Sequence, residues 1–333
     1  MAAMGIAAPR LQAEKLKPVT GDPYVGAIAI DAATGKVLEE SNADGPGYPA
    51  SVVKLMDLLI LLEKIQQGSL HLTDAVTVTA EASRTGGSQV YLAEKEVFTV
   101  DDLNYAMAVQ SANDAAVALA THVAGTKEAF VGLMNRRAGE LGMKSTQYHS
   151  VHGLPPGAGQ APDVSTPRDL AILARELLKY PDTLRYTSTR ERPFRNGKFI
   201  LRAHNHLLGS FEGCDGLKTG WFPAAGYSIV ATAQRDGRRV IAVVMGSQSR
   251  TTRDAAAREL LSRGLAALPP VPPPVIVTNA VSTNLPAKVV PSEAVKKPPR
   301  LTLATGATIA LAVFVVMAAV FFARRSRQSH TSR

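Results

Sequence analysis

The stretch PASVVKLM, residues 49–56, begins a run of apolar residues at helical spacing that ends at Gly68. Ser51 and Lys54 are three positions apart, so on a helix their side chains share one face and the lysine amine can reach the serine oxygen. A helix start also favours a developing anion, because its N–H groups are unpaired. A serine there is equally an ordinary N-cap, so this pair alone is weak evidence for a nucleophile and its base.

Strand patterns lie at both ends of the surrounding sequence, and helical patterns lie between them. Apolar runs that flank turn residues predict two hairpins: 24–31 with 36–39, and 226–234 with 239–245. Apolar residues at helical spacing predict further helices: 101–110, 114–124, 127–141, 166–179 and 252–268. This order predicts an α/β (α+β) domain over residues 22–268, with an antiparallel sheet made by both ends and an inserted helical lobe.

The triplet Ser111-Ala112-Asn113 lies in the break between two of these helices. A hydroxyl and an amide two positions apart in an extended loop can point the same way, which gives a proton relay and a group that binds a peptide bond. Either side chain could instead cap the second helix.

The triplet Lys218-Thr219-Gly220 lies on a predicted late strand. Gly220 would let a ligand approach the backbone closely along the strand edge. The alternative is a solvated lysine on an edge strand, which many sheets carry.

In this order, the three triplets resemble the three motifs of serine β-lactamases and penicillin-binding proteins. Longer segments are similar to the D-alanyl-D-alanine carboxypeptidases, the low-molecular-mass penicillin-binding proteins: YPASVVKLM, TGGSQVYL, VQSANDAAVALA, FVGLMNRRAGELGM, STPRDLAILA, GLKTGW and AAGYSIVATA. The resemblance covers residues 22–268 in unbroken order. It implies the penicillin-binding-protein fold and a serine-type carboxypeptidase, without a cofactor, that removes the terminal D-alanine from peptidoglycan stem pentapeptides. It also implies that β-lactam antibiotics are covalent inhibitors.

The resemblance further implies roles in catalysis. Ser51 would be the nucleophile and Lys54 its general base, with the pKa of Lys54 lowered by burial and by Lys218 as a neighbouring cation. Ser111 would pass a proton to the leaving D-alanine, and Asn113 would hold the amide of the substrate.

Six positions would bind the substrate: Asn113, Lys218, Thr219, Gly220, Trp221 and Arg253. Lys218 and Thr219 would meet the terminal carboxylate, with support from Arg253, which could otherwise be a helix-surface arginine. The backbone N–H groups of Ser51 and Trp221 would form the oxyanion hole.

Three alternatives remain at this point. A β-lactamase would carry aspartate in place of Ala112 and a glutamate that activates water, and residues 142–170 contain no glutamate. An endopeptidase that cuts cross-links would use the same residues as a carboxypeptidase. A non-catalytic wall-binding protein would keep the fold but would have no need of Lys54.

The net charge of +9 lies mostly near the C-terminus, where residues 269–333 hold eight basic side chains and one acid. A nucleic-acid-binding protein would carry this charge on its folded domain, so we expect no nucleic-acid partner. Residues 269–300 are proline-rich and predict a semi-rigid spacer. Residues 301–323 are uncharged and, as a helix, would span about 34 Å, enough to cross a membrane. The basic residues 324–333 then predict a cytoplasmic tail and a single-pass protein with its catalytic domain on the outer face.

Other features exclude some kinds of site. A single cysteine, Cys214, rules out an intramolecular disulfide. The seven histidines form no HExxH pair, and His204 and His206 have no third ligand nearby, so we expect no metal. Residues 1–21 form an N-terminal segment whose apolar residues are interrupted by charges. Either an export signal lies upstream of residue 1 or export depends on something else, and we favour the first.

Overall fold

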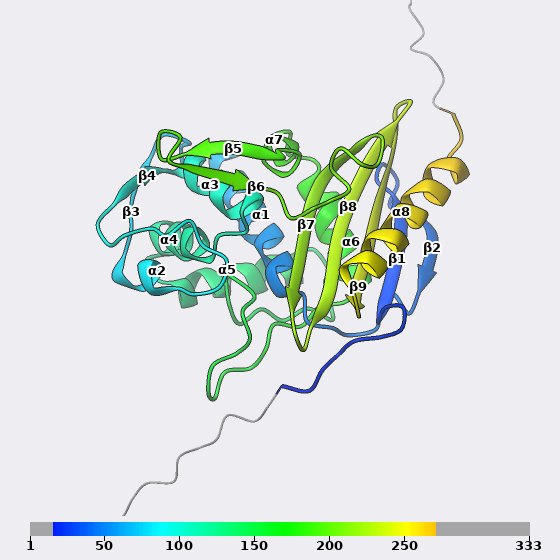
Figure 1. Ribbon diagram of the computed structural model, residues 1–333, viewed down its shortest axis with the longest axis horizontal. Helices are drawn as coiled ribbons and strands as arrows, with labels where there is room; N and C mark the ends of the chain where they lie inside the picture. The colour runs from blue at the N-terminus through cyan, green and yellow to red at the C-terminus, as the bar shows by residue number, and fades with distance from the viewer. Residues whose placement is uncertain (1–15, 271–333) are drawn as a thin grey trace, which may run out of the picture. The chain divides into compact units, whose positions relative to one another are not determined.

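The computed structural model describes residues 16–270, in which a five-stranded sheet lies beside a lobe of helices (Figure 1). The strand order is β2-β1-β9-β8-β7, and every neighbouring pair is antiparallel. The strands are β1 (Gly26–Asp31), β2 (Val37–Ser41), β7 (Cys214–Phe222), β8 (Gly226–Arg235) and β9 (Arg238–Ser247). The predicted mixed α/β fold is confirmed, with a sheet that joins the two ends of the domain.

Alternation along the strands divides the sheet into two apolar faces. On β9, three residues pack toward the helical lobe: Ile241, Val243 and Met245. The alternate residues of β9, which are Val240, Ala242 and Val244, point to the opposite face. There they belong to a second cluster, which also includes residues of α8 (Arg250–Ala267). This period of two is the spacing of side chains on a strand, so each face of the sheet is buried. Helix α6 (Pro167–Leu177) contacts β1 and β9 and belongs to the lobe-side cluster.

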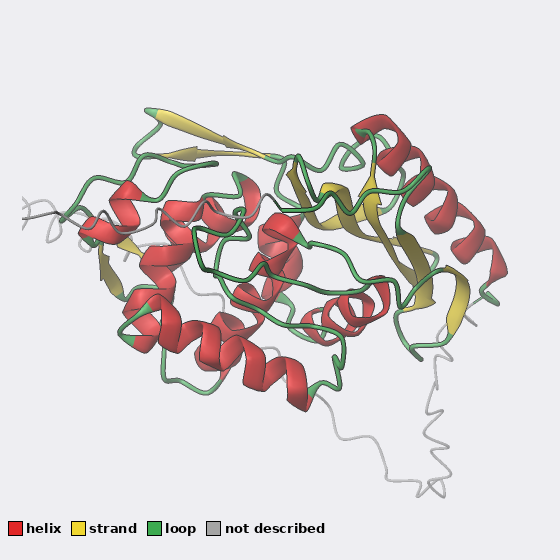
Figure 2. Cartoon of the chain, turned by 90° about the horizontal axis from the view of Figure 1, so that it is seen from below, coloured by secondary structure: helices red, strands yellow, loops and turns green. Residues whose placement is uncertain are grey.

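The helical lobe is built around one central helix, α1 (Lys54–Gln66), in which every residue from Lys54 to Leu62 is buried. Because this part of the helix is buried on every side, its sequence carries a continuous run of large apolar residues rather than one apolar stripe. Four helices of the lobe contact α1: α3 (Val100–Val109), α4 (Asn113–Ala124), α5 (Lys127–Glu140) and α7 (Asp182–Thr187). The short helix α2 (Ala80–Arg84) packs on α4, and Figure 2 shows a group of helices beside the sheet. The site residues that begin α1 therefore stand on a rigid element.

The structure departs from the predicted elements in two ways. The helix predicted from Ser51 begins instead as a 3-10 turn, η1 (Ala50–Val53), which runs directly into α1. Two short helices, α2 and α7, and two small antiparallel strand pairs were not predicted. The pairs are β3 (Ala75–Thr77) with β4 (Val97–Thr99), and β5 (Glu191–Phe194) with β6 (Phe199–Arg202). Strands of three or four residues are too short for a periodic pattern to stand out.

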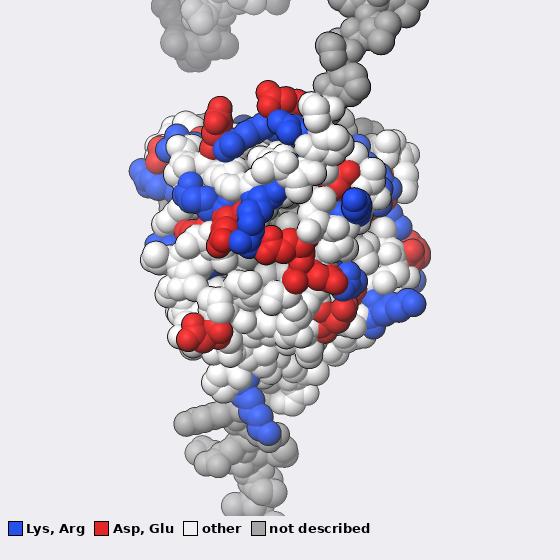
Figure 3. All heavy atoms as spheres, turned by 90° about the vertical axis from the view of Figure 1, so that its right-hand side faces the viewer, with Lys and Arg blue, Asp and Glu red and all other residues white. Residues whose placement is uncertain are grey.

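No helix within residues 16–270 combines the length and the apolar character needed to cross a membrane. The predicted transmembrane segment 301–323 and basic tail 324–333 lie outside the described residues, as does all but the start of the predicted spacer. On the face seen in Figure 3, acidic and basic side chains are interspersed. The excess positive charge of the chain therefore does not form a single patch on this face.

Candidate active site

Ser51 and Lys54 lie at the junction between η1 and α1, where the sequence predicted a nucleophile beside an amine. The Nζ of Lys54 is 3.0 Å from the Oγ of Ser51. Ser51 does not cap the turn, because the N-cap is Pro49 and no side chain caps it. Ala50 has a φ of 49°, a left-handed conformation that costs energy for any residue other than glycine. The strained residue fixes the backbone immediately before Ser51.

The amine of Lys54 is enclosed by acceptors, and its side chain is only 1% exposed. Besides Ser51, it donates to the Oδ1 of Asn113 at 2.7 Å and to the carbonyl of His152 at 2.8 Å. Burial lowers the pKa of Lys54 to about 7, while the negative charge of Asp57, one helical turn further on, opposes that shift. Of the two causes that the resemblance implied, burial is therefore the main one, and the charge of Lys218 is not among the main influences on this amine. An amine with such a pKa is substantially neutral at physiological pH.

A loop after α5 supplies the carbonyl that holds Lys54. Asp163 accepts hydrogen bonds from the backbone N–H groups of His149 and Ser150 and from the Ser150 hydroxyl, which in turn accepts from the N–H of Gly153. These bonds fix the turn that carries His152. Asp163 thus positions the lysine through the backbone, without touching it.

Gly153 lies directly against the turn that precedes Ser51. Its φ is 73°, and a Cβ at this position would overlap the carbonyl group of Ala50. Gly153→Ala is therefore expected to destabilise the domain by about 2–4 kcal/mol and to slow acylation of Ser51, since the loop must move away from Lys54.

Urea unfolding and penicillin acylation rates would measure both effects. Gly159→Ala is a matched control: Gly159 has a φ of 76°, but nothing lies within 4 Å of the added Cβ. Equal losses in the two variants would show that backbone strain, and not the contact with Ala50, accounts for the effect.

Ser111 and Lys218 form a second pair on the opposite wall. The Nζ of Lys218 donates to the Oγ of Ser111 at 2.9 Å and to the carbonyl of Thr219 at 3.0 Å. Ser111 itself has a φ of 62°, a left-handed conformation. Both hydroxyls are thus placed by a left-handed residue, which is Ser111 itself here and Ala50 next to Ser51. Burial and the charges of Lys54 and Arg253 lower the pKa of Lys218 well below its usual range.

Asn113 links this wall to the first pair. Its Oδ1 accepts from Lys54, and its Nδ2 donates to the carbonyl of Gly86 at 2.7 Å. Neither Ser111 nor Asn113 caps α4, whose N-cap is Ala112 without a side-chain bond. The neighbouring Asp114, which the sequence did not single out, accepts from the N–H groups of two loop residues, Val90 and Leu92, and so anchors the loop beside the site.

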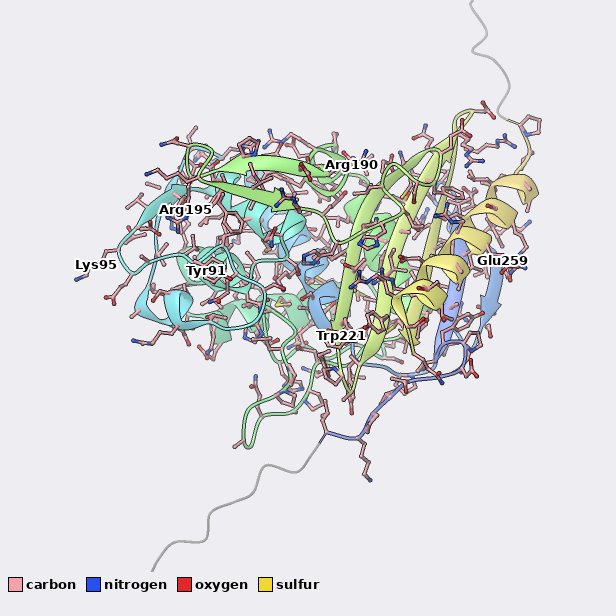
Figure 4. The ribbon with its side chains drawn as sticks, viewed as in Figure 1. Tyr91, Lys95, Arg190, Arg195, Trp221 and Glu259 are labelled. Carbon is pink, nitrogen blue, oxygen red and sulfur yellow. The ribbon has the colours of Figure 1, made fainter. Side chains whose placement is uncertain are left out.

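Strand β7 forms the edge of the sheet next to Ser51. A Cβ on Gly220 would collide with the carbonyl of Pro49 and would lie 3.0 Å from the amide nitrogen of Ser51. Only glycine lets the strand approach the turn this closely. Trp221 follows on β7 (Figure 4), is 52% exposed and stacks on Tyr227. The edge strand is thus placed to receive an extended peptide beside the nucleophile.

These groups line one cleft with a cavity of about 420 Å³. The lining residues are Ser51, Ser88, Ser111, His204, His206, Thr219, Gly220, Trp221, Tyr227, Arg250 and Arg253. Lys54, Asn113 and Lys218 stand behind the two serines through the hydrogen bonds given above. The structure therefore brings together all nine predicted site residues.

Sequence analysis did not single out three residues that support or line the cleft. Asp163 and Asp114 act through hydrogen bonds to loops that have no periodic pattern, so no signal pointed to them. Arg250 was overlooked although it lies three positions before Arg253, a spacing that places both on one helix face. In the described residues no cluster of three metal-ligating side chains occurs, and His204 and His206 meet no third ligand.

Comparisons with known proteins agree with this geometry. A model of the D-alanyl-D-alanine carboxypeptidase family matches residues 24–249. The chain is 37% identical over 238 residues to the D-alanyl-D-alanine carboxypeptidase DacF of Bacillus subtilis, and 39% identical over 245 residues to DacC of Escherichia coli. Each match covers 71% of this chain and 60% of the relative, so the chain spans about three fifths of the length of these curated relatives.

Two solved structures show the same similarity in three dimensions. Penicillin-binding protein D2 from Listeria monocytogenes, in its ampicillin-bound form, is 34% identical with a TM-score of 0.66, and the match covers 72% of this chain and 96% of that one. The carboxypeptidase DacD from Francisella tularensis is 28% identical with a TM-score of 0.69, and the match covers 78% and 74%. On the matched residues and the arrangement of the three motifs, the chain belongs to the D-alanyl-D-alanine carboxypeptidase family.

Proposed function

We propose that this protein is a serine-type D-Ala-D-Ala carboxypeptidase, which removes the terminal D-alanine from peptidoglycan stem pentapeptides through an acyl-enzyme on Ser51. The observation that carries the proposal is the buried Lys54 amine, with a pKa of about 7, at 3.0 Å from the Ser51 hydroxyl. An amine that is neutral at working pH and within hydrogen-bond reach can act as a general base. Ser51 is thereby activated as a nucleophile.

In the acylation step, Lys54 takes the proton of Ser51 as the oxygen attacks the carbonyl carbon of the penultimate D-alanine. The negative charge that develops on the carbonyl oxygen faces the N–H groups of Ser51 and Trp221. The carbon–nitrogen bond then breaks as Ser111 gives its proton to the leaving nitrogen, and Ser111 regains a proton from Lys54, which is neutral again for the next step. Lys218, which donates to Ser111, keeps that hydroxyl in place.

Substrate would lie along the free edge of β7. Asn113 holds its amide, while Lys218 and Thr219 receive the terminal carboxylate with Arg253 in support. A water molecule then hydrolyses the acyl-enzyme, which releases the shortened peptide and returns the proton to Ser51.

The same cleft supports covalent inhibition by β-lactam antibiotics, which acylate the same serine. None of the described residues lining the cleft is an acid. The buried Asp163 is already engaged by three donors of the loop that it holds. The cleft therefore lacks the carboxylate that a β-lactamase uses to activate water, and this supports a long-lived penicillin adduct rather than rapid turnover.

The proposed location is the outer face of the cell membrane, with residues 301–323 as a single-pass anchor and 269–300 as a spacer. The apolar composition of 301–323 and its basic flanks support this. The membrane fraction of expressing cells should contain the full chain, and a chain ending at residue 300 should leave it. Retention of the shortened chain would contradict the anchor.

The deciding experiment measures D-alanine release from a pentapeptide ending in D-Ala-D-Ala, together with labelling by a fluorescent penicillin. We expect release of one D-alanine per peptide and a stable adduct on the peptide that contains Ser51. Labelling without release would favour a non-catalytic wall-binding protein. Cleavage of cross-linked dimers in preference to pentapeptides would favour an endopeptidase, and steady turnover of nitrocefin would favour a β-lactamase.

A further inference from the structure

The proposed acylation step creates a buried positive charge. When Lys54 takes the proton of Ser51, its amine becomes an ammonium at a residue that is only 1% exposed. Its Nζ donates to the hydroxyl of Ser51, the amide oxygen of Asn113 and the carbonyl oxygen of His152, and none of these acceptors is an acid. A buried ammonium without an opposite charge nearby is costly. An acid close to Lys54 would therefore favour the proton transfer.

Three acidic side chains raise the pKa of Lys54 by their negative charges, and the largest of these effects comes from Asp57. The other two acids already hold loops in place. Asp163 accepts from three donors of the loop after α5, and Asp114 accepts from the N–H groups of Val90, Leu92 and Ala115. Asp57 differs from both, because among the described residues neither of its oxygens has a hydrogen-bond partner.

Asp57 lies on α1, one helical turn after Lys54, and is 2% exposed. Within residues 16–270 its carboxyl group forms no ion pair, so it acts on the Lys54 amine through space. A carboxyl group buried without donors costs stability, and an apolar side chain in its place is often more stable. We propose that Asp57 is a positioning residue for the catalytic base: its carboxylate balances the ammonium that forms when Lys54 takes the proton of Ser51.

Lys54 and Asp57 affect each other in both directions. Burial raises the pKa of Asp57 well above its usual range, and the charge of Lys54 opposes that shift, just as the charge of Asp57 opposes the lowered pKa of Lys54. The two groups therefore titrate as a pair, in which a protonated Lys54 favours an ionised Asp57. Without Asp57, burial would lower the pKa of Lys54 further and make the amine a weaker base.

The other titratable groups around the pair do not supply a negative charge. Lys218 on β7 is a second amine, and the charge of Lys54 contributes to lowering its pKa. Burial lowers the pKa of His152 to about 3, so its ring is neutral at pH 7. Tyr148 is fully buried, and its pKa is raised well above the usual range by burial and then by the charge of Asp57, so its hydroxyl stays protonated.

This role of Asp57 rests on the proposed function, in which Lys54 is the base. The test is stopped-flow acylation by penicillin across the pH range in Asp57→Asn, which keeps the shape of the side chain but cannot ionise. Loss of the negative charge lowers the pKa of Lys54, so the pH at which the rate levels off should fall by about one unit. The rate above that pH should be about tenfold lower than in the parent protein, because a weaker base accepts the proton less readily.

Two further variants separate charge from packing. Asp57→Leu keeps a branched side chain and also removes the charge, so it should show the same pH shift. It should unfold at a higher urea concentration than the parent protein, because a buried carboxyl group without partners has been removed. Glu63→Gln is the matched control, since Glu63 lies on the same helix but bonds to Arg137, and it should keep the pH midpoint of the parent.

An unchanged pH midpoint in both Asp57 variants would overturn this role. If the same variants also unfolded at lower urea concentrations, Asp57 would be a packing residue and nothing more. Failure of the proposed function would be seen separately, as an absence of D-alanine release from a pentapeptide by the parent protein.

Discussion

Replacement of Ser51 by alanine is expected to abolish penicillin labelling and to reduce D-alanine release by about 10⁴-fold or more. The Oγ of Ser51 is the atom that forms the acyl bond, and it is the hydroxyl held by the Lys54 amine at 3.0 Å. Loss of one oxygen at a partly buried position removes the chemistry while it leaves the packing of η1 almost unchanged. Gel fluorescence with a labelled penicillin and a coupled D-alanine assay would measure the two losses.

Ser188→Ala serves as the matched control for this variant. Ser188 is an exposed serine that follows α7, and its hydroxyl donates to the carbonyl of Leu184, away from the residues that line the cleft. It should retain both labelling and release. Penicillin labelling that survives in a folded Ser51→Ala protein would assign the nucleophile to another residue, and the proposed mechanism would then fail.

Lys54→Gln is expected to lower the rate of acylation by about 10²–10⁴-fold, the usual contribution of a general base. The glutamine amide can still donate to the carbonyl of His152, but it cannot take the proton of Ser51. Stopped-flow acylation by penicillin would give the rate. Lys64→Gln, which changes a partly exposed lysine further along α1, should acylate like the parent protein.

The pH dependence of acylation follows from the same residue. Because burial lowers the pKa of Lys54 to about 7, the amine is mostly protonated below that pH and cannot act as a base. The rate in the parent protein should therefore rise about tenfold per pH unit up to about pH 7 and level off above it. A rate that stays flat from pH 5 to pH 8 would show that Lys54 is not the base, whatever the effect of its replacement.

The parts of this molecule that sequence predicted well are those in which spacing determines geometry. The three-residue interval from Ser51 to Lys54 places the two groups together on any helical turn, and alternation along β8 and β9 predicts the buried sheet. The break between α3 and α4 was visible because helical spacing stops at Ser111.

The parts that sequence missed depend on contacts between distant segments. The carbonyl of His152 reaches Lys54 because Asp163 holds a turn that has no periodic pattern. Asp57 is an acidic residue at a buried position of α1, among apolar neighbours. It is buried at 2% exposure, and among the described residues neither of its oxygens has a hydrogen-bond partner, so burial raises its pKa well above the usual range. Only the three-dimensional packing shows that this buried carboxyl group lies close enough to influence Lys54.

The pairing of β1 with β9 determines when the protein can become active. Ile30 pairs with Ile241, so strands separated by more than two hundred residues must meet before the sheet closes. During synthesis, β1 emerges early and its partner emerges only when the chain has reached residue 247. Contacts this distant in sequence form slowly, and an unpaired strand edge is exposed until they do. Lys218 precedes β9 along the chain and Arg253 follows it, so the proposed substrate-binding wall is completed only after Ser51 has been synthesised.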